Sequence, residues 1–274
     1  MIVTLTGATG FIGTRLVERL RDERHEVRII SRDGSNASEA VNGADGVVNL
    51  AGEPVSQRWN DAVKRRIRES RVNSTRRVVQ AIAGASQRPR VLVSASAIGY
   101  YGSRGDEILT ESSAPGKGFL PEVCVEWERE AAQTNVRIVL PRIGIVLGAA
   151  GGMMKSVLPA FKAGLGGKLA SGKQWMSWIH VDDLIGMILF ALTNDDVRGP
   201  VNGVSPNPVR NAEFTAALGR ALHRPTILST PAIALKLIFG EMSEIILASA
   251  RVLPGAGFEY RHPDLGEALA NLLH

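Results

Sequence analysis

Apolar and polar positions follow a regular order along the first half of the chain. A short β-branched run over Ile2–Leu5 ends at a glycine cluster, and Phe11–Arg24 follows with apolar residues at helical spacing. The same order repeats, and it predicts strands over Glu26–Ile30, Asp45–Leu50, Arg90–Ser94 and Val136–Leu140 and a helix over Glu122–Ala132. Strands that alternate with helices in this way predict a parallel sheet with both faces covered.

The connection between Ile30 and Asp45 interrupts this order. It is too short for a helix, a strand and a second helix, so we expect one shortened or missing unit there. The order of the strands in the sheet is therefore left open.

The pattern changes after Gly148, where a stretch rich in glycine and lysine begins. Ser177–Leu192 predicts a turn followed by an apolar helix, and Asn211–Leu222 and Ala232–Arg251 also have helical patterns. The sequence therefore predicts a doubly wound α/β domain at residues 1–147, with its sheet completed by residues 199–204. Residues 148–198 and 205–274 are expected to form a smaller, mainly helical substrate lobe.

The composition excludes several classes of protein. With 274 residues, of which 45% are apolar and 22% charged, the chain is neither disordered nor a coiled coil. The longest apolar stretches, Ile185–Leu192 and Pro231–Phe239, are far shorter than the roughly 20 residues of a membrane span, so we expect no membrane partner. The N-terminal segment lacks the pattern of a secretory signal, and a single cysteine, Cys124, excludes an internal disulfide and a thiolate-rich zinc site. These features favour the cytoplasm.

The net charge of +5 is compatible with a nucleic-acid partner, with an anionic cofactor or with neither. The densest basic run is Lys64–Arg77, which contains one acidic residue. Its arginines are spread around a helix and no aromatic residue interleaves with them, so a solvated face explains the run better than a nucleic-acid patch. We therefore expect no nucleic-acid partner.

The strongest motif is the glycine-rich segment Thr6-Gly7-Ala8-Thr9-Gly10-Phe11-Ile12-Gly13, between the first strand and the first helix. Gly7 permits a tight turn, Gly10 permits the backbone to approach a pyrophosphate, and Gly13 permits close packing of helix and strand. The helix start then offers free N–H groups and a partial positive charge to phosphates. The alternative is a plain tight strand-to-helix turn. Contacts to a dinucleotide are expected from Gly7, Thr9, Gly10, Phe11, Ile12 and Gly13.

The Gly-x-x-Gly-x-x-Gly spacing resembles the extended short-chain dehydrogenase/reductases, the group of sugar-nucleotide epimerases and dehydratases. Further segments of that group follow in order: Asn49-Leu50-Ala51-Gly52, Val72-Asn73-Ser74-Thr75, Pro141-Arg142-Ile143-Gly144 and Trp178-Ile179-His180-Val181-Asp182-Asp183. Other segments resemble the atypical "epimerase family" branch, which carries a C-terminal domain of unknown function: Ala97–Gly102, Trp127-Glu128 and the tail Leu222-His223-Arg224-Pro225…Pro254…Gly257-Phe258. The resemblance covers nearly the whole chain.

This resemblance implies further cofactor contacts. It places Leu50, Ala51 and Gly52 along the cofactor, and it places the basic helix of residues 64–77 beside it. Arg71 lies one turn before the Val72–Thr75 segment, and we expect it to reach a phosphate or ribose of the cofactor.

The end of the second predicted strand bears on the choice between NAD and NADP. NAD-binding folds usually place an acidic residue there, whereas this chain has Ser31 and Arg32. A hydroxyl followed by a guanidinium suits the 2′-phosphate of NADP, which is the cofactor we predict. Two alternatives stay open: Arg32 is a solvated surface residue, or the strand ends two residues later and Asp33 accepts from the ribose of NAD.

The resembled superfamily normally uses a Ser or Thr together with a Tyr-x-x-x-Lys helix, whose spacing places Tyr and Lys on one face. When Glu128 is aligned with the acidic residue that follows that motif, Leu120 stands at the Tyr position and Cys124 at the Lys position. Leucine carries no proton. We expect Cys124 to pack beside the nicotinamide rather than to react as a thiolate.

Three other residues are candidates for the missing chemistry. Ser96 lies at the end of a strand in the register of the usual Ser/Thr, ahead of Ser94, and Tyr100 and Tyr101 follow in one loop. A tyrosine with a pKa of about 10 needs a cation beside it to act near pH 7, and Tyr100 stands four residues before Arg104. We predict catalytic roles for Ser96, Tyr100 and Tyr101. The alternative is that both tyrosines only line the pocket.

His180 is a possible general base, but its sequence context favours a structural role. We expect it to bond backbone and to fix the turn into a helix that Asp182 or Asp183 caps. Trp175, Trp178 and Lys155 either line the cleft between the lobes or belong to an ordinary core and surface. No grouping of His, Cys and Glu has the spacing of metal ligands, so no metal is expected.

Two hypotheses for the function remain. In the first, the resemblance implies an NADP-dependent oxidoreductase or epimerase that acts on an unidentified small substrate. In the second, the chain is an NADP(H)-binding scaffold or sensor without turnover, because relatives of this branch have been labelled cell-division-inhibitor-like. The absent Tyr and Lys favour the second hypothesis, whereas the complete cofactor apparatus favours neither. The sequence predicts neither the substrate nor the oligomeric state.

Overall fold

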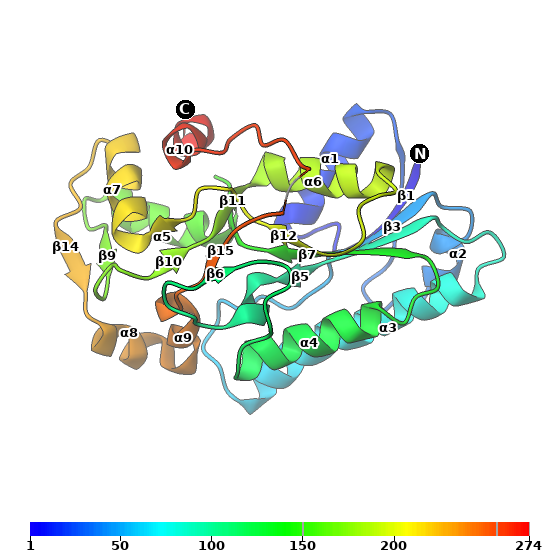
Figure 1. The fold of residues 1–274 in the computed structure, drawn as a ribbon, viewed down its shortest axis with the longest axis horizontal. Helices are drawn as coiled ribbons and strands as arrows, with labels where there is room; N and C mark the ends of the chain where they lie inside the picture. The colour runs from blue at the N-terminus through cyan, green and yellow to red at the C-terminus, as the bar shows by residue number, and fades with distance from the viewer. Residues whose placement is uncertain (150, 256, 274) are drawn as a thin grey trace.

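A parallel sheet forms the centre of the computed structural model, which describes residues 1–149, 151–255 and 257–273 (Figure 1). Its strands lie in the order β2–β1–β3–β4–β7–β12, and all neighbouring pairs are parallel. The strands are β1 (Ile2–Thr6), β2 (Glu26–Ile29), β3 (Gly46–Asn49), β4 (Val91–Ser94), β7 (Arg137–Ile143) and β12 (Gly199–Gly203), and the short β5 (Ser96–Ala97) also pairs with β7. The predicted doubly wound α/β fold is confirmed.

Helices cover both faces of this sheet (Figure 1). One layer holds α1 (Phe11–Asp22) and α6 (Val181–Thr193), and the other holds α2 (Ala37–Val41), α3 (Asp61–Gly84) and α4 (Phe119–Ala131). Neighbouring residues of a strand point to opposite layers: Val48 packs with α1 and α6, whereas Val47 packs with α2 and α3. Burial on both sides explains why the strands are continuous apolar runs.

The shortened unit expected after β2 is present. The chain passes from β2 to β3 through α2, which has five residues, and β3 then pairs on the other side of β1. The strand order therefore reverses between β1 and β3. At such a point the loops after the strands diverge, and ligands bind in the crevice at the carboxyl ends.

The apolar helix α6 differs from the expected domain division, which placed residues 148–198 in the second lobe. Its buried residues Leu184, Ile185 and Ile188 pack with α1 and the sheet of the first domain. The physical reason is that α1 alone leaves much of this sheet face open, and a helix that is apolar on most sides has to be buried. β12 completes the sheet as predicted.

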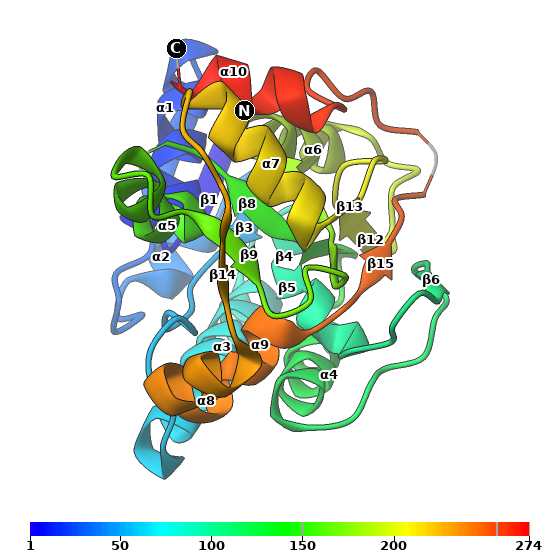
Figure 2. The same ribbon diagram turned by 90° about the vertical axis from the view of Figure 1, so that its left-hand side faces the viewer.

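The second lobe lies at the carboxyl ends of the parallel strands, on the left of Figure 1 and in front in Figure 2. Its core is formed by α5 (Gly152–Lys162), α7 (Asn211–Ala221) and α10 (Leu265–Leu273), around the fully buried Trp178. Short strand pairs join it together: β8 (Ile145–Leu147) with β11 (Trp178–His180), β9 (Gly167–Leu169) with β14 (Leu228–Thr230), β10 (Trp175–Met176) with β13 (Val209–Arg210), and β15 (Arg251–Val252) with β6 (Ile108–Leu109).

The long helix expected over Ala232–Arg251 is interrupted. The structure has α8 (Ala232–Phe239), a 3₁₀ turn at Gly240–Met242 and α9 (Ser243–Leu247). Gly240 has a φ of +60°, which lies outside the helical region and ends α8. In the part of the chain that the structure describes, no helix is both long and apolar enough to cross a membrane.

Candidate cofactor and active site

The glycine-rich turn has the geometry that the sequence requires of it. Gly7 has a φ of +70°, and a Cβ added to it would lie 2.8 Å from the carbonyl carbon of Leu50. A Cβ on Gly13 would overlap the carbonyl oxygen of Gly7, so helix and strand approach as closely as glycine permits. Thr9 and Gly10 are exposed, Phe11 and Ile12 are half-buried, and α1 begins without a side-chain cap or an acidic residue in its first turn. Its free N–H groups are thus left for an anion.

A buried polar network fixes the loop opposite this turn. The hydroxyl of Thr6 accepts the backbone N–H groups of Leu50 and Ala51, both at 3.1 Å, and donates to Oδ1 of Asn49 at 2.7 Å. The Asn49 amide in turn donates to the hydroxyl of Thr75 at 2.8 Å. The network holds the segment Leu50–Gly52 across from the glycine turn at the carboxyl edge of the sheet.

Arg71 lies directly against this loop. Its guanidinium carbon is 3.2 Å from the position of a Cβ on Gly52, and Nη1 donates to the carbonyl oxygen of Glu53 at 3.0 Å. The guanidinium also lies over the Trp127 ring, 5.2 Å from its centroid. Burial lowers the pKa of the Arg71 guanidinium from its ordinary value. The structure therefore brings a half-buried positive charge to Gly52.

The end of β2 carries an exposed polar group of residues. Ser31 and Arg32 are exposed, and Ser31 donates to Oδ1 of Asp33 at 2.6 Å. Asp33 also accepts from the backbone N–H of Ser35 at 3.1 Å. The hydrogen bonds from Ser31 and Ser35 lower the pKa of Asp33 to about 2. One oxygen of the Asp33 carboxylate, Oδ1, thus bonds to neighbours within its own loop.

Arg77 is a residue of this group that sequence reasoning missed. It extends from α3, donates from Nη1 to the carbonyl oxygen of Asp33 at 3.0 Å, and packs against Gly34. Arg77 belongs to the basic run 64–77, but no neighbouring residue in the sequence indicates that this part of α3 reaches the loop after β2. The structure therefore places two arginines, Arg32 and Arg77, at the loop after β2.

Leu120 and Cys124, which stand at the Tyr and Lys positions of the family motif, face the 3₁₀ turn Ile98–Tyr101. A Cβ on Gly99 would lie 3.6 Å from Cβ of Leu120 and 3.8 Å from Sγ of Cys124, so the turn lies directly on this face of α4. Cys124 is buried, and burial raises the pKa of its thiol to about 12. The thiol stays protonated at neutral pH, which fits packing rather than nucleophilic chemistry.

Ser96 belongs to a buried ion-pair network that the sequence did not reveal. Its hydroxyl donates to Oε1 of Glu128 at 2.6 Å. Glu128 accepts two hydrogen bonds of 2.8 Å from Nε and Nη2 of Arg142. All three side chains are buried, and Arg142 is only 3% exposed. Both Glu128 and Arg142 stand in quoted motifs, Trp127-Glu128 and Pro141-Arg142, but their pairing depends on the fold.

The two candidate tyrosines have different surroundings. Tyr101 is fully buried, donates to Oδ1 of Asn202 at 2.6 Å and accepts from Nη1 of Arg142 at 3.0 Å. Burial raises the pKa of Tyr101 above its ordinary value of 10. Tyr100 is half-buried, and the guanidinium carbon of Arg142 lies 3.5 Å from its ring centroid. The cation beside Tyr100 is therefore Arg142 and not Arg104, whose guanidinium pairs with Glu107.

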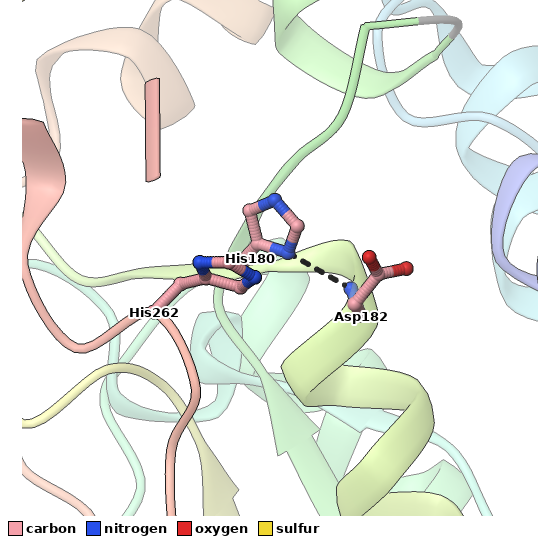
Figure 3. Close-up of side chains that lie close together, drawn as sticks. All are labelled: His180, Asp182 and His262. Carbon is pink, nitrogen blue, oxygen red and sulfur yellow. Dashed lines mark hydrogen bonds between the residues drawn. The ribbon is translucent and has the colours of Figure 1, made fainter. Parts of the chain in front are cut away.

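His180 caps α6, as Figure 3 shows. Its Nδ1 accepts from the backbone N–H of Asp182 at 3.1 Å, so the cap is His180 itself and not Asp182 or Asp183. Asp183 accepts instead from the backbone N–H groups of Arg261 and His262. Burial, and next the nearby His262, lower the pKa of His180, which keeps the ring neutral and able to accept.

The same three side chains, His180, Asp182 and His262, have ligating atoms within 4.8 Å of one another. One ring nitrogen of His180, Nδ1, is used by the cap, whereas Nε2 is buried and has no hydrogen-bond partner among the described residues. The Asp182 carboxylate is neutralised by Nε of Arg15 at 3.0 Å. Of the other residues named from the sequence, Trp178 belongs to the core and Lys155 is exposed. Trp175 is half-buried, and the guanidinium carbons of Arg210 and Arg251 lie 4.2 and 4.6 Å from its ring centroid.

Two protein-family models match this sequence. The model of the NAD dependent epimerase/dehydratase family matches residues 3–202, and that of a domain of unknown function (DUF1731) matches residues 230–272. The chain belongs to the epimerase family. The resemblance given by the sequence motifs is thus confirmed, including the C-terminal domain.

Individual members of the epimerase family match over the whole chain. The chloroplastic epimerase family protein SDR39U1 homolog of Arabidopsis thaliana is 43% identical, over 100% of this chain and 87% of its own length. Epimerase family protein Mb2239 of Mycobacterium bovis is 41% identical, over 98% of this chain and 96% of its own. Because the first relative is described as chloroplastic, the cytoplasmic location of this chain stays a prediction.

Solved structures extend the comparison. Human epimerase family protein SDR39U1 (isoform2), solved with NADPH, has a TM-score of 0.94 and 34% identity and covers 100% of this chain and 99% of its own. MoeE5 in complex with UDP-glucuronic acid and NAD has a TM-score of 0.79 at 20% identity, with 100% of this chain and 98% of its own covered. The second likeness shows the fold alone.

Proposed function

We propose that the protein binds NADP(H) and transfers a hydride between the nicotinamide and a small substrate, as an oxidoreductase or an epimerase. The observation that carries the proposal is the joint placement of the glycine-rich turn and the two arginines Arg32 and Arg77. The turn offers backbone N–H groups at a helix start, which suit a pyrophosphate. The arginines stand at the end of β2, where relatives of this fold bind the adenosine ribose.

The choice of NADP over NAD follows from the charges at the end of β2. An NAD site usually has an acidic residue at the end of this strand, whereas this chain has Ser31 and Arg32 there, and Oδ1 of the following Asp33 already accepts from Ser31 and Ser35. A 2′-phosphate is an anion, and guanidinium groups bind it through charge-assisted hydrogen bonds. The human relative solved with NADPH supports this choice.

Titration of the purified protein with NADPH and with NADH, followed by cofactor fluorescence, tests the cofactor proposal. We expect NADPH to bind more tightly than NADH. Equal affinities or a preference for NADH would overturn the argument from Arg32 and Arg77.

For the chemistry, the bound cofactor supplies or accepts the hydride. Among the three candidates, Tyr100 is the one whose side chain is partly exposed, so we assign it to proton transfer at its phenolic oxygen. Arg142 lies against its ring and fixes its orientation. Ser96 and Tyr101 have their protons committed to Glu128 and Asn202, so we assign them to holding the loop.

The second candidate function, NADP(H) binding without turnover, also has an observation in its favour. The positions of the family's Tyr and Lys hold Leu120 and a buried thiol with a pKa near 12. Two readouts separate the two functions. Loss of NADPH absorbance with a panel of carbonyl compounds detects a net reduction, and chromatography of nucleotide sugars incubated with the NADP(H)-loaded protein detects epimerisation, which leaves the cofactor unchanged at the end of each cycle. Turnover of any member supports the first function, whereas tight binding without turnover across the panel supports the second.

The expected partner is a small molecule and not nucleic acid. Several cations of the basic run face acidic side chains within the protein: Arg76 binds Glu130 through two hydrogen bonds of 3.0 and 2.9 Å, and Arg68 lies near Glu122 and Glu126. Cations that are paired in this way contribute less to a phosphate backbone than a free stripe would.

A further inference from the structure

The segment α8–α9, residues 232–247, extends from the second lobe to the first. In both views it lies beside the N-terminal ends of α3 and α4 (Figures 1 and 2). Its two ends are held by strand pairs, β14 with β9 before it and β15 with β6 after it. The segment is therefore tethered on both sides and rests on the first domain in between.

The contact surface is a small apolar cluster. Met242 of the segment is buried together with Trp59, Val63 and Ile67 of the first domain. The half-buried residues around them are Val55, Phe119, Leu120, Phe239, Ile245 and Ile246. Because an apolar cluster of this kind excludes water, the segment covers this part of the first domain.

The cluster joins two segments that border the proposed nicotinamide site, the loop between β3 and α3 and the start of α4. Trp59 lies in the loop between β3 and α3, which begins with the cofactor-facing residues Leu50–Gly52. Phe119 and Leu120 start α4, and the ring of Phe119 meets Trp59 edge-on with centroids 5.2 Å apart. Leu120 stands where the family's catalytic Tyr would be. The segment thus lies over the place where the resemblance puts the nicotinamide.

The attachment of the segment is light. On the opposite side of α8, Ile233 and Leu237 are each 73% exposed, so this helix buries little of its apolar surface. One ion pair, Lys64 with Glu241, adds to the apolar cluster, and its carboxylate is more than half exposed. Exposed ion pairs contribute little, and elements with few buried contacts open at low cost in free energy.

We propose that residues 232–247 are a lid over the nicotinamide end of the cofactor cleft, closed by the Met242 cluster and opened for exchange of cofactor and substrate. The proposal rests on the proposed binding of NADP(H) in this cleft. When closed, the lid excludes water from the reacting centre, and its opening limits the rate at which NADP(H) leaves.

Release of NADPH provides the test, because it needs no known substrate. Protein loaded with NADPH is mixed with excess NADP⁺ in a stopped-flow fluorimeter, and the loss of bound-NADPH fluorescence gives the release rate. Met242→Ala is expected to raise this rate about tenfold, which corresponds to about 1.4 kcal/mol lost from the closed state. Glu241→Gln is expected to raise it about twofold. The matched control is Leu237→Ala, which changes an exposed residue of the same segment and should leave the rate unchanged.

A covalent lock tests the same lid without weakening it. In a Lys64→Cys/Glu241→Cys variant, a short bis-maleimide links the segment to α3, and the native Cys124 does not compete because it is buried and protonated. Linking after loading should slow the release of NADPH at least tenfold, whereas modification of the Lys64→Cys single variant should not.

The outcomes are distinct. A linked protein that releases NADPH as fast as the unlinked one, or Met242→Ala and Glu241→Gln variants that are folded and release at the normal rate, overturn the lid alone. A wild-type protein that binds no NADPH overturns the proposed function and the lid with it. If Met242→Ala does not fold, the Glu241→Gln variant and the covalent lock still decide.

Discussion

The two ends of the proposed cofactor site use polar groups in opposite ways. At the glycine-turn end, the start of α1 has no side-chain cap and Arg32 is exposed. At the tyrosine end, the polar side chains of Ser96, Glu128, Arg142 and Tyr101 bond one another and are buried. The first end is therefore ready to receive an anionic ligand, whereas the second is satisfied without one.

This difference separates residues that are available for ligand binding from residues that stabilise the fold. Open donors contribute free energy only when a ligand arrives, so they are kept for binding. Buried pairs stabilise a conformation in the absence of any ligand, and breaking one leaves an uncompensated charge. We therefore expect changes at the tyrosine end to alter stability more than affinity, and changes at the glycine-turn end to alter affinity.

The largest effect is expected from Arg142→Met. The variant leaves the Glu128 carboxylate buried without its cation, which should lower the free energy of unfolding by about 3–5 kcal/mol, as measured by urea denaturation. Glu128→Gln/Arg142→Met, which removes both charges, should recover part of this loss. The affinity for NADPH of the molecules that remain folded should be unchanged. An Arg142→Met variant that has normal stability but no longer binds NADPH would contradict the difference between the two ends.

Gly13→Ala is expected to be next in size. The added Cβ would overlap the carbonyl oxygen of Gly7, and neither backbone can move freely, so the unfolding free energy should fall by about 1–3 kcal/mol. The matched control is Gly84→Ala at the end of α3, where nothing lies within 4 Å of the added Cβ. Thermal or urea unfolding of both variants measures the effect, and equal stabilities would show that the close approach at Gly13 is unimportant.

Arg32→Ala and Arg77→Ala test the open charges directly. A hydrogen bond to a charged group contributes about 1.5–3 kcal/mol, so each variant should weaken NADPH roughly ten- to hundredfold and leave NADH nearly unchanged. Arg66→Ala, which removes an exposed arginine elsewhere on α3, is the control. Fluorescence titration gives the affinities. Equal losses for NADPH and NADH would mean that the arginines act on the shared part of the cofactor rather than on the 2′-phosphate.

The smallest effect concerns pH and the cap of α6. Burial lowers the pKa of His180 in the folded state, so the unfolded chain binds more protons once the pH falls below the unfolded value of about 6.5. Stability should therefore decrease as the pH drops through this range, by at most about 1.4 kcal/mol per pH unit for this one group. His180→Asn keeps an acceptor for the Asp182 N–H and should make the decrease less steep in urea unfolding between pH 7 and 5. An unchanged slope would assign the dependence to other groups.

Much of the fold was predictable because it is encoded locally. The glycine spacing of residues 7–13 and the apolar runs of the strands each lie within one short segment, so their meaning does not depend on distant contacts. Leu120 and Cys124 lie on one helix, so their four-residue spacing on one face could also be predicted from the sequence.

What the sequence could not give depends on segments that meet only in the folded chain. Arg77 meets the loop after β2 from another helix, and the Glu128–Arg142 pair joins α4 to β7. Helix α6 was expected in the second lobe but packs with α1 and the sheet, because the apolar pattern of a helix does not specify which surface the helix covers. The cap at His180 was missed because histidine is an uncommon N-cap, and only the geometry distinguishes it from the aspartates that follow.

The short passage from β2 to β3 also bears on the order in which the chain folds. Ile2 pairs with Glu26 and Val3 with Gly46, so β1, β2 and β3 are close neighbours in sequence, whereas β12 pairs with β7 only after the chain has made β8 to β11 and α6. Loop closure costs less entropy for near neighbours, which favours early pairing of the first three strands. In pulsed hydrogen exchange during refolding, amides of β1 and β3 should gain protection before those of β12. The glycine-rich turn after β1 would then be assembled before the second lobe packs against it.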